Sequence, residues 1–227
     1  MAHIGSCMPD TMALRLRHLY MEIIDGTGPG GDNAYTHYAD QDSDGDEEYP
    51  FSNLQLQYHN SDHFSDMCAF VNRCKNLESL GLVGTQRIEL EGLNFQSMNG
   101  GLKNIYLSRV LCTAEKLLSL LPSNNGEGIA SNIEAFEVEG SALWDGTWEA
   151  VLARLVAAPS LLHFHIHNLI YDRHGLSSRF HEHNNRIWEN GEDIWTENDD
   201  DKVRLYDVIK AIKDRGRAVD EDMDEYV

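Results

Sequence analysis

The chain has 227 residues, 41% of them hydrophobic, and a formal net charge of −20 from 38 acidic and 18 basic residues. Seventeen acidic residues lie in three runs without any basic residue, at 40–48, 192–201 and 220–225, and the remaining 21 nearly balance the 18 basic ones. Such runs are typical of solvated loops and tails. Because no basic stripe is present, the composition argues against nucleic acid and against anionic membranes as partners.

The sequence gives no indication of membrane insertion or secretion. No apolar stretch approaches the length of about 18 residues that a membrane-spanning helix needs, and Met1–Pro9 lacks the basic and apolar regions of a secretory signal. The four cysteines, at positions 7, 68, 74 and 112, show no Cys-x-x-Cys spacing, which favours reduced thiols. We therefore expect an intracellular protein of the cytoplasm or nucleus.

The first two copies of an apolar pattern, Leu-x-x-Leu-x-Leu, are weak ones. They are Leu16/Leu19/Met21 and Phe51/Leu54/Leu56. The second begins 26 residues before the next copy, whereas 35 residues separate the two weak copies from one another. We interpret the excess, the Gly- and Asp-rich segment 25–49, as a loop inserted between two repeats.

Four clear copies of the pattern follow, with first positions 25, 31 and 28 residues apart. They are Leu77/Leu80/Leu82, Leu102/Ile105/Leu107, Ile133/Phe136/Val138 and Leu161/Phe164/Ile166. Such a period is typical of repeat proteins. The last two apolar positions of each copy lie on one side of a short strand. One copy cannot bury that side alone, so we expect successive strands to pair in parallel.

Amphipathic helices are predicted between the strands. The first carries Phe64, Met67, Val71 and Cys74 on one face, the second spans 114–121 before Pro122, and the third runs from an N-cap at Thr147 to Pro159. In the third helix, Trp148 is expected to be a core aromatic residue. The predicted unit is therefore strand, connection, helix and strand.

The pattern fades after Ile166, and residues 168–195 show no clear period. A last helix at 201–215, with Val203, Tyr206 and Ile209 facing inward, is expected to cap the open end of the stack. The predicted organisation is an N-terminal segment at 1–15, repeats at 16–190, and an acidic segment with the capping helix at 191–227.

The strand pattern and its helices resemble leucine-rich-repeat proteins over roughly residues 51–170. A narrower resemblance, to the C-terminal repeat regions of fungal F-box-type proteins, is carried by four segments: CKNLESL at 74–80, GLKNIYL at 101–107, GTWEAVL at 146–152 and LLHFHI at 161–166. The resemblance implies an α/β leucine-rich-repeat solenoid, with a curved parallel sheet on its concave face and helices on its convex face.

The narrower resemblance also implies target recognition for a ubiquitin ligase. An F-box is a short three-helix module with a Leu-Pro signature, and none is found upstream of Leu16; the Leu-Pro at 121–122 ends a helix. The chain would then be a fragment of such a protein or a version without the F-box. Recruitment of ligase components is left open, and recognition of a protein partner remains.

Three histidines, His163, His165 and His167, alternate along the last clear strand, opposite Phe164 and Ile166. Two histidines so spaced can share a zinc ion. No Cys or carboxylate is spaced along the sequence to complete a tetrahedral site. We therefore interpret them as ordinary exposed histidines of a polar, partner-facing strand, with metal binding as an alternative.

No other motif indicates catalysis. The run Asp40-x-Asp42-x-Asp44-Gly45 matches the start of a calcium loop, but its twelfth position is Phe51 instead of Glu, so we interpret it as a solvated loop. Nucleophile, phosphate-loop and dinucleotide motifs do not occur in the sequence. We expect that the protein binds no cofactor and is not an enzyme. The alternative among enzymes is a metal-dependent hydrolase that uses the row of histidines.

The outward positions of the strands form the predicted binding surface. One row is Asn53, Ser79, Asn104, Ala135 and His163, and the next is Gln55, Gly81, Tyr106, Glu137 and His165. The candidate partner-binding residues are Asn53, Gln55, Ser79, Asn104, Tyr106, Glu137, His163, His165 and His167. Tyr106 is the one large amphipathic anchor, a typical hot-spot residue. The sequence predicts protein–protein recognition, as a ligase substrate receptor or, alternatively, as a structural scaffold.

Overall fold

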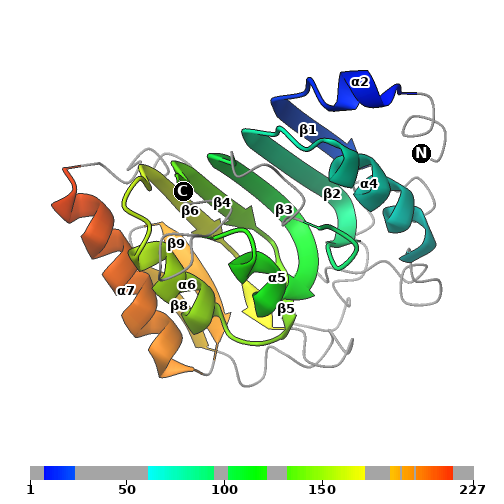
Figure 1. Ribbon diagram of the computed structural model, residues 1–227. Coiled ribbons are helices and arrows are strands. Elements are labelled where there is room, and N and C mark those ends of the chain that lie inside the picture. Colours follow the sequence, from blue (N-terminus) through cyan, green and yellow to red (C-terminus); the bar gives the residue numbers. More distant parts are fainter. Residues whose placement is uncertain are drawn as a thin grey trace, which may run out of the picture.

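The computed structural model has a mixed α/β fold with a mostly parallel, open sheet (Figure 1). It describes residues 8–23, 61–94, 102–121, 132–171, 185–189, 191–196 and 198–216. The central strands, in spatial order, are β1 (His18–Ile23), β2 (Ser79–Glu89), β3 (Asn104–Thr113), β4 (Ala135–Glu139) and β6 (His163–His167). Each strand is parallel to the one before it, so the order in the sheet follows the order in the chain. Two short strands, β5 (Ala142–Asp145) and β7 (Ile170–Tyr171), continue the sheet beside the end of β3.

The four clear copies of the apolar pattern lie in register across the sheet. Leu80 pairs with Ile105, which pairs with Phe136, which pairs with Phe164. A second row, two residues further along each strand, consists of Leu82, Leu107, Val138 and Ile166. All eight side chains are at most 1% exposed and belong to one hydrophobic core. The parallel pairing and the register predicted from the pattern are confirmed for these copies.

Strand β1 pairs directly with β2, with Leu19 beside Leu80 and Met21 beside Leu82. The prediction that the copy beginning at Phe51 forms the strand between them is therefore wrong. Spacing in the sequence does not fix which strands are neighbours. A longer connection between two paired strands costs little additional closure entropy, so two repeats can pair across a long intervening segment. Residues 51–56, with Asn53 and Gln55, and the expected inserted loop at 25–49 lie outside the described residues.

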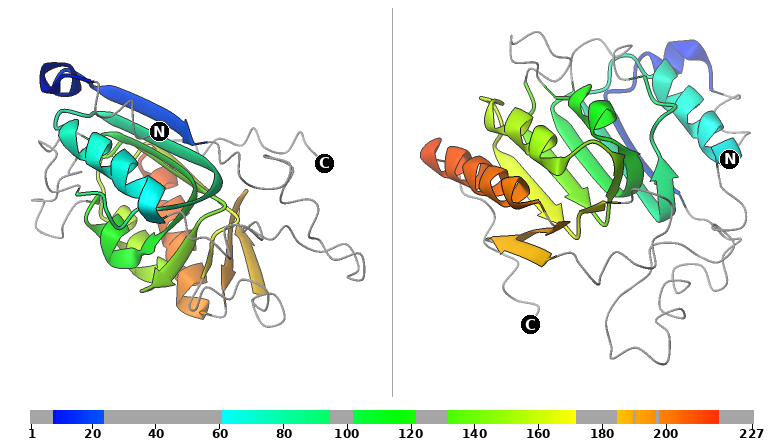
Figure 2. Two further views of the ribbon diagram at one scale, coloured as in Figure 1. Left: turned by 90° about the vertical axis from the view of Figure 1, so that its right-hand side faces the viewer. Right: turned by 90° about the horizontal axis from the view of Figure 1, so that it is seen from below.

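Three helices cover the core side of the sheet: α4 (Ser61–Arg73), α5 (Ala114–Leu118) and α6 (Trp148–Val156) (Figures 1 and 2). The N-cap prediction is confirmed at Thr147, whose hydroxyl oxygen accepts a hydrogen bond from the Ala150 amide at 3.2 Å. The predicted second helix is shorter than expected and ends at Leu118. A short helix, α2 (Asp10–Ala13), precedes β1. Within the part of the chain that is described, no helix has the length and apolarity to cross a membrane.

Helix α7 (Asp199–Asp214) packs along α6 at the end of the sheet that carries β6 (Figure 1). Its buried aliphatic side chains are Leu205, Val208, Ile209 and Ile212. The predicted face was correct for Ile209 and wrong for Val203 and Tyr206, which are 55% and 56% exposed. The stripe that is buried also has helical spacing and consists only of aliphatic residues, so it packs better against α6.

An antiparallel hairpin, β8 (Asn185–Glu189) and β9 (Glu192–Thr196), lies beside β6 (Figure 1). Backbone hydrogen bonds join it to the residues that follow β6: the Trp195 amide donates to the Leu169 carbonyl at 2.7 Å, and the Leu169 amide to the Asp193 carbonyl at 3.4 Å. The hairpin falls largely within the segment for which the sequence predicted no pattern. It places β9 against the outer edge of the parallel sheet.

Candidate partner-binding face of the sheet

The side chains that point away from the helices form the open face of the sheet. Across β1, β2, β3, β4 and β6 they lie in three rows: His18, Ser79, Asn104, Ala135 and His163; Tyr20, Gly81, Tyr106, Glu137 and His165; and Glu22, Val83, Ser108, Glu139 and His167. Seven predicted site residues, all except Asn53 and Gln55, are thus brought onto one surface. The two predicted rows are confirmed from β2 to β6, and His18 and Tyr20 take the places expected for Asn53 and Gln55.

Two tyrosine rings form a stacked pair on the open face. Tyr20 of β1 and Tyr106 of β3 have ring centroids 6.3 Å apart and an interplanar angle of 8°. Gly81 of β2 lies between them in the same row, and a Cβ atom there would lie 2.5 Å from Cδ2 of Tyr20. The Tyr20 ring can cross β2 because Gly81 has no side chain.

Tyr20 is 63% exposed and was not among the predicted binding residues. The available signal was its position between Leu19 and Met21, which makes it an outward residue of the first weak copy. This position indicated a place on the open face only if the copy beginning at Leu16 was assumed to pair directly with β2.

An open hollow of about 310 Å³ lies beside the tyrosine pair. Its lining includes both rings and also His18, Ser79, Asn104, Ala135 and Glu137. Side-chain hydrogen bonds order its floor: Asn104 Nδ2 donates to Ser79 Oγ at 3.0 Å, and His18 Nδ1 lies 3.0 Å from the same hydroxyl oxygen. The hollow therefore combines aromatic walls, polar groups already oriented by hydrogen bonds, and one carboxylate.

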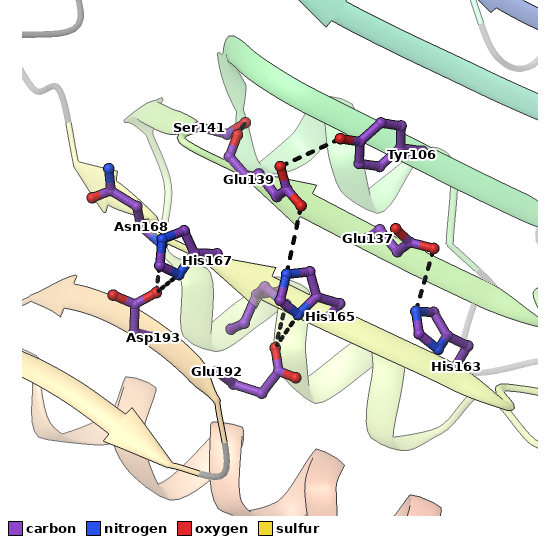
Figure 3. A network of polar contacts seen from close by, with 11 residues as sticks. Tyr106, Glu137, Glu139, Ser141, His163, His165, His167, Asn168, Glu192 and Asp193 are labelled. Atoms are coloured by element: carbon purple, nitrogen blue, oxygen red, sulfur yellow. Dashed lines mark hydrogen bonds and ion pairs between the residues drawn. The ribbon is translucent and has the colours of Figure 1, made fainter. Parts of the chain in front are cut away.

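His165 lies between two carboxylates at the centre of a polar network (Figure 3). Its Nε2 is 3.5 Å from Glu139 Oε1 and its Nδ1 is 3.6 Å from Glu192 Oε2. Hydrogen bonding to Glu139 and then to Glu192 raises the pKa of His165 to about 10, against the opposing effect of burial. The imidazole is therefore positively charged at neutral pH.

The same network reaches Tyr106, whose hydroxyl donates to Glu139 Oε2 at 3.3 Å (Figure 3). Burial, followed by the negative charge of Glu139, raises the pKa of Tyr106 to about 12. The hydrogen bond from His165, the largest cause, keeps the pKa of Glu139 below its usual range. Glu139 thus remains ionised and accepts hydrogen bonds from both neighbours.

The other two histidines also lie against carboxylates (Figure 3). His163 Nε2 is 3.3 Å from Glu137 Oε1, and His167 Nδ1 is 2.9 Å from Asp193 Oδ1. His167 is exposed as predicted, whereas His163 and His165 are partly buried. The adjacent strands β4 and β9 supply acidic partners to all three, which spacing along β6 cannot show. Among the described residues, no group of three or more His, Cys, Asp or Glu side chains could hold a metal ion.

The acidic residues of β9 occupy hydrogen-bonding positions at the edge of β6. The Glu192 carboxylate accepts a hydrogen bond from the Ile166 amide, and the Asp193 carboxylate accepts one from the Asn168 amide. Burial raises the pKa of Glu192. Carboxylate oxygens thus stand where a further strand would place carbonyl groups, which satisfies exposed edge donors.

Asp201 is a third buried acid of the same run. Its carboxylate accepts hydrogen bonds from Tyr171 Oη at 2.8 Å, Thr196 Oγ1 at 2.6 Å and the Glu149 amide at 2.7 Å. Glu192, Asp193 and Asp201 are 2%, 0% and 0% exposed. The prediction that the whole run 192–201 is solvated is therefore wrong, since these three side chains supply acceptors to buried donors.

Trp148 belongs to the core, as predicted, and the three described cysteines are buried there too, whereas Cys7 lies outside the described residues. Trp148 is 1% exposed, and its indole Nε1 donates to the Ile170 carbonyl at 3.0 Å. Cys68, Cys74 and Cys112 are buried free thiols, and burial raises the pKa of Cys68 to about 11. These thiols are therefore protonated at neutral pH and are poor nucleophiles.

No protein-family model matches the chain, and neither the curated proteins nor the solved structures contain a protein to which it is detectably similar.

Proposed function

We propose that the protein is a leucine-rich-repeat solenoid that recognises a protein partner through the open face of its sheet. The observation that carries this proposal is the stacked pair of Tyr20 and Tyr106 beside the hollow. Tyrosine is enriched among residues that dominate binding energy, because it combines a large apolar ring with a polar hydroxyl. The chain-ordered parallel strands and the 25- to 31-residue period support the solenoid.

The size of the face favours an extended segment of the partner over a whole domain. Its five strands, spaced by about 4.8 Å, and three rows, spaced by about 6.7 Å, span roughly 19 by 13 Å between the outermost positions. A standard interface buries about 800 Å² on each partner, more than this face offers in projection. A peptide lying across the strands would contact the tyrosine pair and the histidine–carboxylate network together.

A substrate receptor of a ubiquitin ligase is one form of this function, and a structural scaffold is the other. Both functions use the same face for the partner. They differ in whether the protein also binds the components of a ligase. Recovery of ligase components together with a partner bound to this face favours the receptor, whereas a single stable partner favours the scaffold.

The test is selection from a random peptide library displayed on phage, using the wild-type protein as bait. Peptides that bind the open face should lose at least about tenfold in affinity, or about 1.4 kcal/mol, toward a Tyr20→Ala/Tyr106→Ala double variant. Tyr206→Ala is the matched control, because Tyr206 is an exposed tyrosine of α7 and lies on no strand of the face. Selected peptides that bind the double variant as well as the wild type would overturn the proposal.

A further inference from the structure

The hollow beside the tyrosine pair has the charge and shape of a site for a cation. Glu137 is the only carboxylate among its lining residues, and the Tyr106 ring is its direct neighbour in the row. Ser79, Gly81 and Ala135, also in the lining, are small and leave room for a side chain to enter. A group that enters would meet an aromatic residue and a carboxylate at the same time.

The surroundings of the hollow are also negative. Glu22 and Glu139 lie in the third row of the same face, and none of the outward positions of the three rows holds Lys or Arg. The positively charged His165 lies between Glu139 and Glu192, so carboxylates of the same network already pair its charge. The face therefore attracts a cationic segment and repels an acidic one.

We propose that the hollow binds an arginine side chain of the partner, with its guanidinium stacked on a ring of the tyrosine pair and paired with Glu137. This inference rests on the proposed function. A guanidinium is planar, stacks on aromatic rings and donates two parallel hydrogen bonds to a carboxylate, whereas a lysine ammonium acts as a point charge. The open face thus selects partners with an exposed basic segment that contains arginine.

Glu137 is oriented for this contact before any partner arrives. Its Oε1 lies 3.3 Å from His163 Nε2 on the adjacent strand, and its side chain is 35% exposed (Figure 3). One oxygen is thus held by β6 while the carboxylate remains accessible to a ligand. Holding the acceptor in place reduces the ordering that binding would otherwise require.

The experiment is an NMR titration of the full chain with N-acetylarginine amide, with N-acetylcitrulline amide as the uncharged ligand of the same shape. We expect a dissociation constant on the order of millimolar for the arginine compound, with shifts at the amides of Gly81, Tyr106 and Glu137. Citrulline should bind at least about tenfold more weakly, and N-acetyllysine amide should bind between the two.

Variants separate the two contacts. Glu137→Gln should weaken arginine binding by about tenfold and leave citrulline unchanged, whereas Glu115→Gln, on the exposed surface of α5, changes the net charge equally and should have no effect. Equal binding of arginine and citrulline, or arginine binding unchanged by Glu137→Gln, would overturn the inference.

The peptide selection separates this inference from the proposed function. Peptides that require the tyrosine pair but contain no arginine would leave recognition by the open face intact and remove the arginine site. Peptides that ignore the tyrosine pair would remove the proposed function, whatever the titration shows.

Discussion

Gly81 controls the shape of the open face because it has no side chain. The Tyr20 ring occupies the space that a Cβ atom at position 81 would need, with a separation of 2.5 Å. Tyr20 is exposed, so its ring can turn into solvent when that space is filled. An added methyl group should therefore change the surface more than the stability.

The Gly81→Ala variant should separate the Tyr20 and Tyr106 rings and abolish peptide binding to the open face. We expect the free energy of unfolding to change by less than about 1 kcal/mol. Alanine is more favourable than glycine in a strand, and this gain offsets the loss of the contact between the rings. Ring-proton chemical shifts of Tyr106 report the separation, and urea denaturation reports the stability.

The matched control places Gly81→Ala in a Tyr20→Ala background, where no ring occupies the space. The same substitution should then leave the Tyr106 shifts unchanged, so that a double-mutant cycle isolates the contact. Tyr106 shifts that stay at their wild-type values in Gly81→Ala alone would show that the glycine has no role in the pair.

At the scale of elements, His165 of β6 connects its own strand to two others, through Glu139 of β4 and Glu192 of β9. The pKa of this imidazole is about 10 in the folded chain, against about 6.5 for an ordinary histidine. Its stabilising contribution is therefore fully present below about pH 6.5 and is lost as the pH rises toward about 10. The lowered pKa of Glu139 also stabilises the fold, and this contribution is lost as the pH falls into the acidic range. The raised pKa of Glu192 has the opposite effect on stability, which rises as the pH falls and Glu192 takes up its proton.

Comparison of His165→Gln with the wild type tests this link between elements. The variant should be less stable by about 1–3 kcal/mol near pH 6, and the difference should shrink toward pH 10 as the wild-type imidazole loses its proton. Urea denaturation at several pH values measures it. A difference that stays constant from about pH 6 to about pH 10 would mean that the charge of His165 contributes nothing.

The elements differ in how far their residues predict them. The inward rows through Leu80 and Leu82 followed from spacing alone, because period-two burial and a repeated length leave one register that buries both rows. The packed face of α7 did not, since two stripes of that helix have helical spacing and only the contact with α6 selects one.

The candidate site shows the same division. The rows of the open face followed from the strand pattern, so Tyr106, Glu137 and His165 were predicted to share a surface. Glu192 was predicted to be solvated, because sequence composition cannot show that the edge of β6 offers amide donors to it. Contacts between distant segments are decided by which edges and faces are left unsatisfied, and a single sequence does not reveal those.

At the scale of the whole molecule, the two ends of the parallel sheet are unequal. Among the described strands, β1 pairs only with β2, and its core-side residues Leu19, Met21 and Ile23 are only partly buried. The other end is covered, because the β8–β9 hairpin lies against β6 and α7 packs on α6. Stability should therefore decrease along the sheet toward β1, which carries Tyr20.

Hydrogen exchange of the native protein should show this gradient. We expect the paired amides of β1 to exchange faster than those of β3 and β4 by a factor on the order of 100, because local opening at an edge needs less free energy than global unfolding. Leu19→Ala should accelerate exchange in β1 alone, at a cost of about 1 kcal/mol, whereas Leu107→Ala, in the centre of the core, should cost about 2–5 kcal/mol and accelerate exchange throughout. Equal protection of β1 and β3 in the wild type would contradict the gradient. Because half of the tyrosine pair lies on this least protected strand, a peptide bound to the open face should slow exchange most in β1, so the same measurement connects the stability of the sheet to its proposed use.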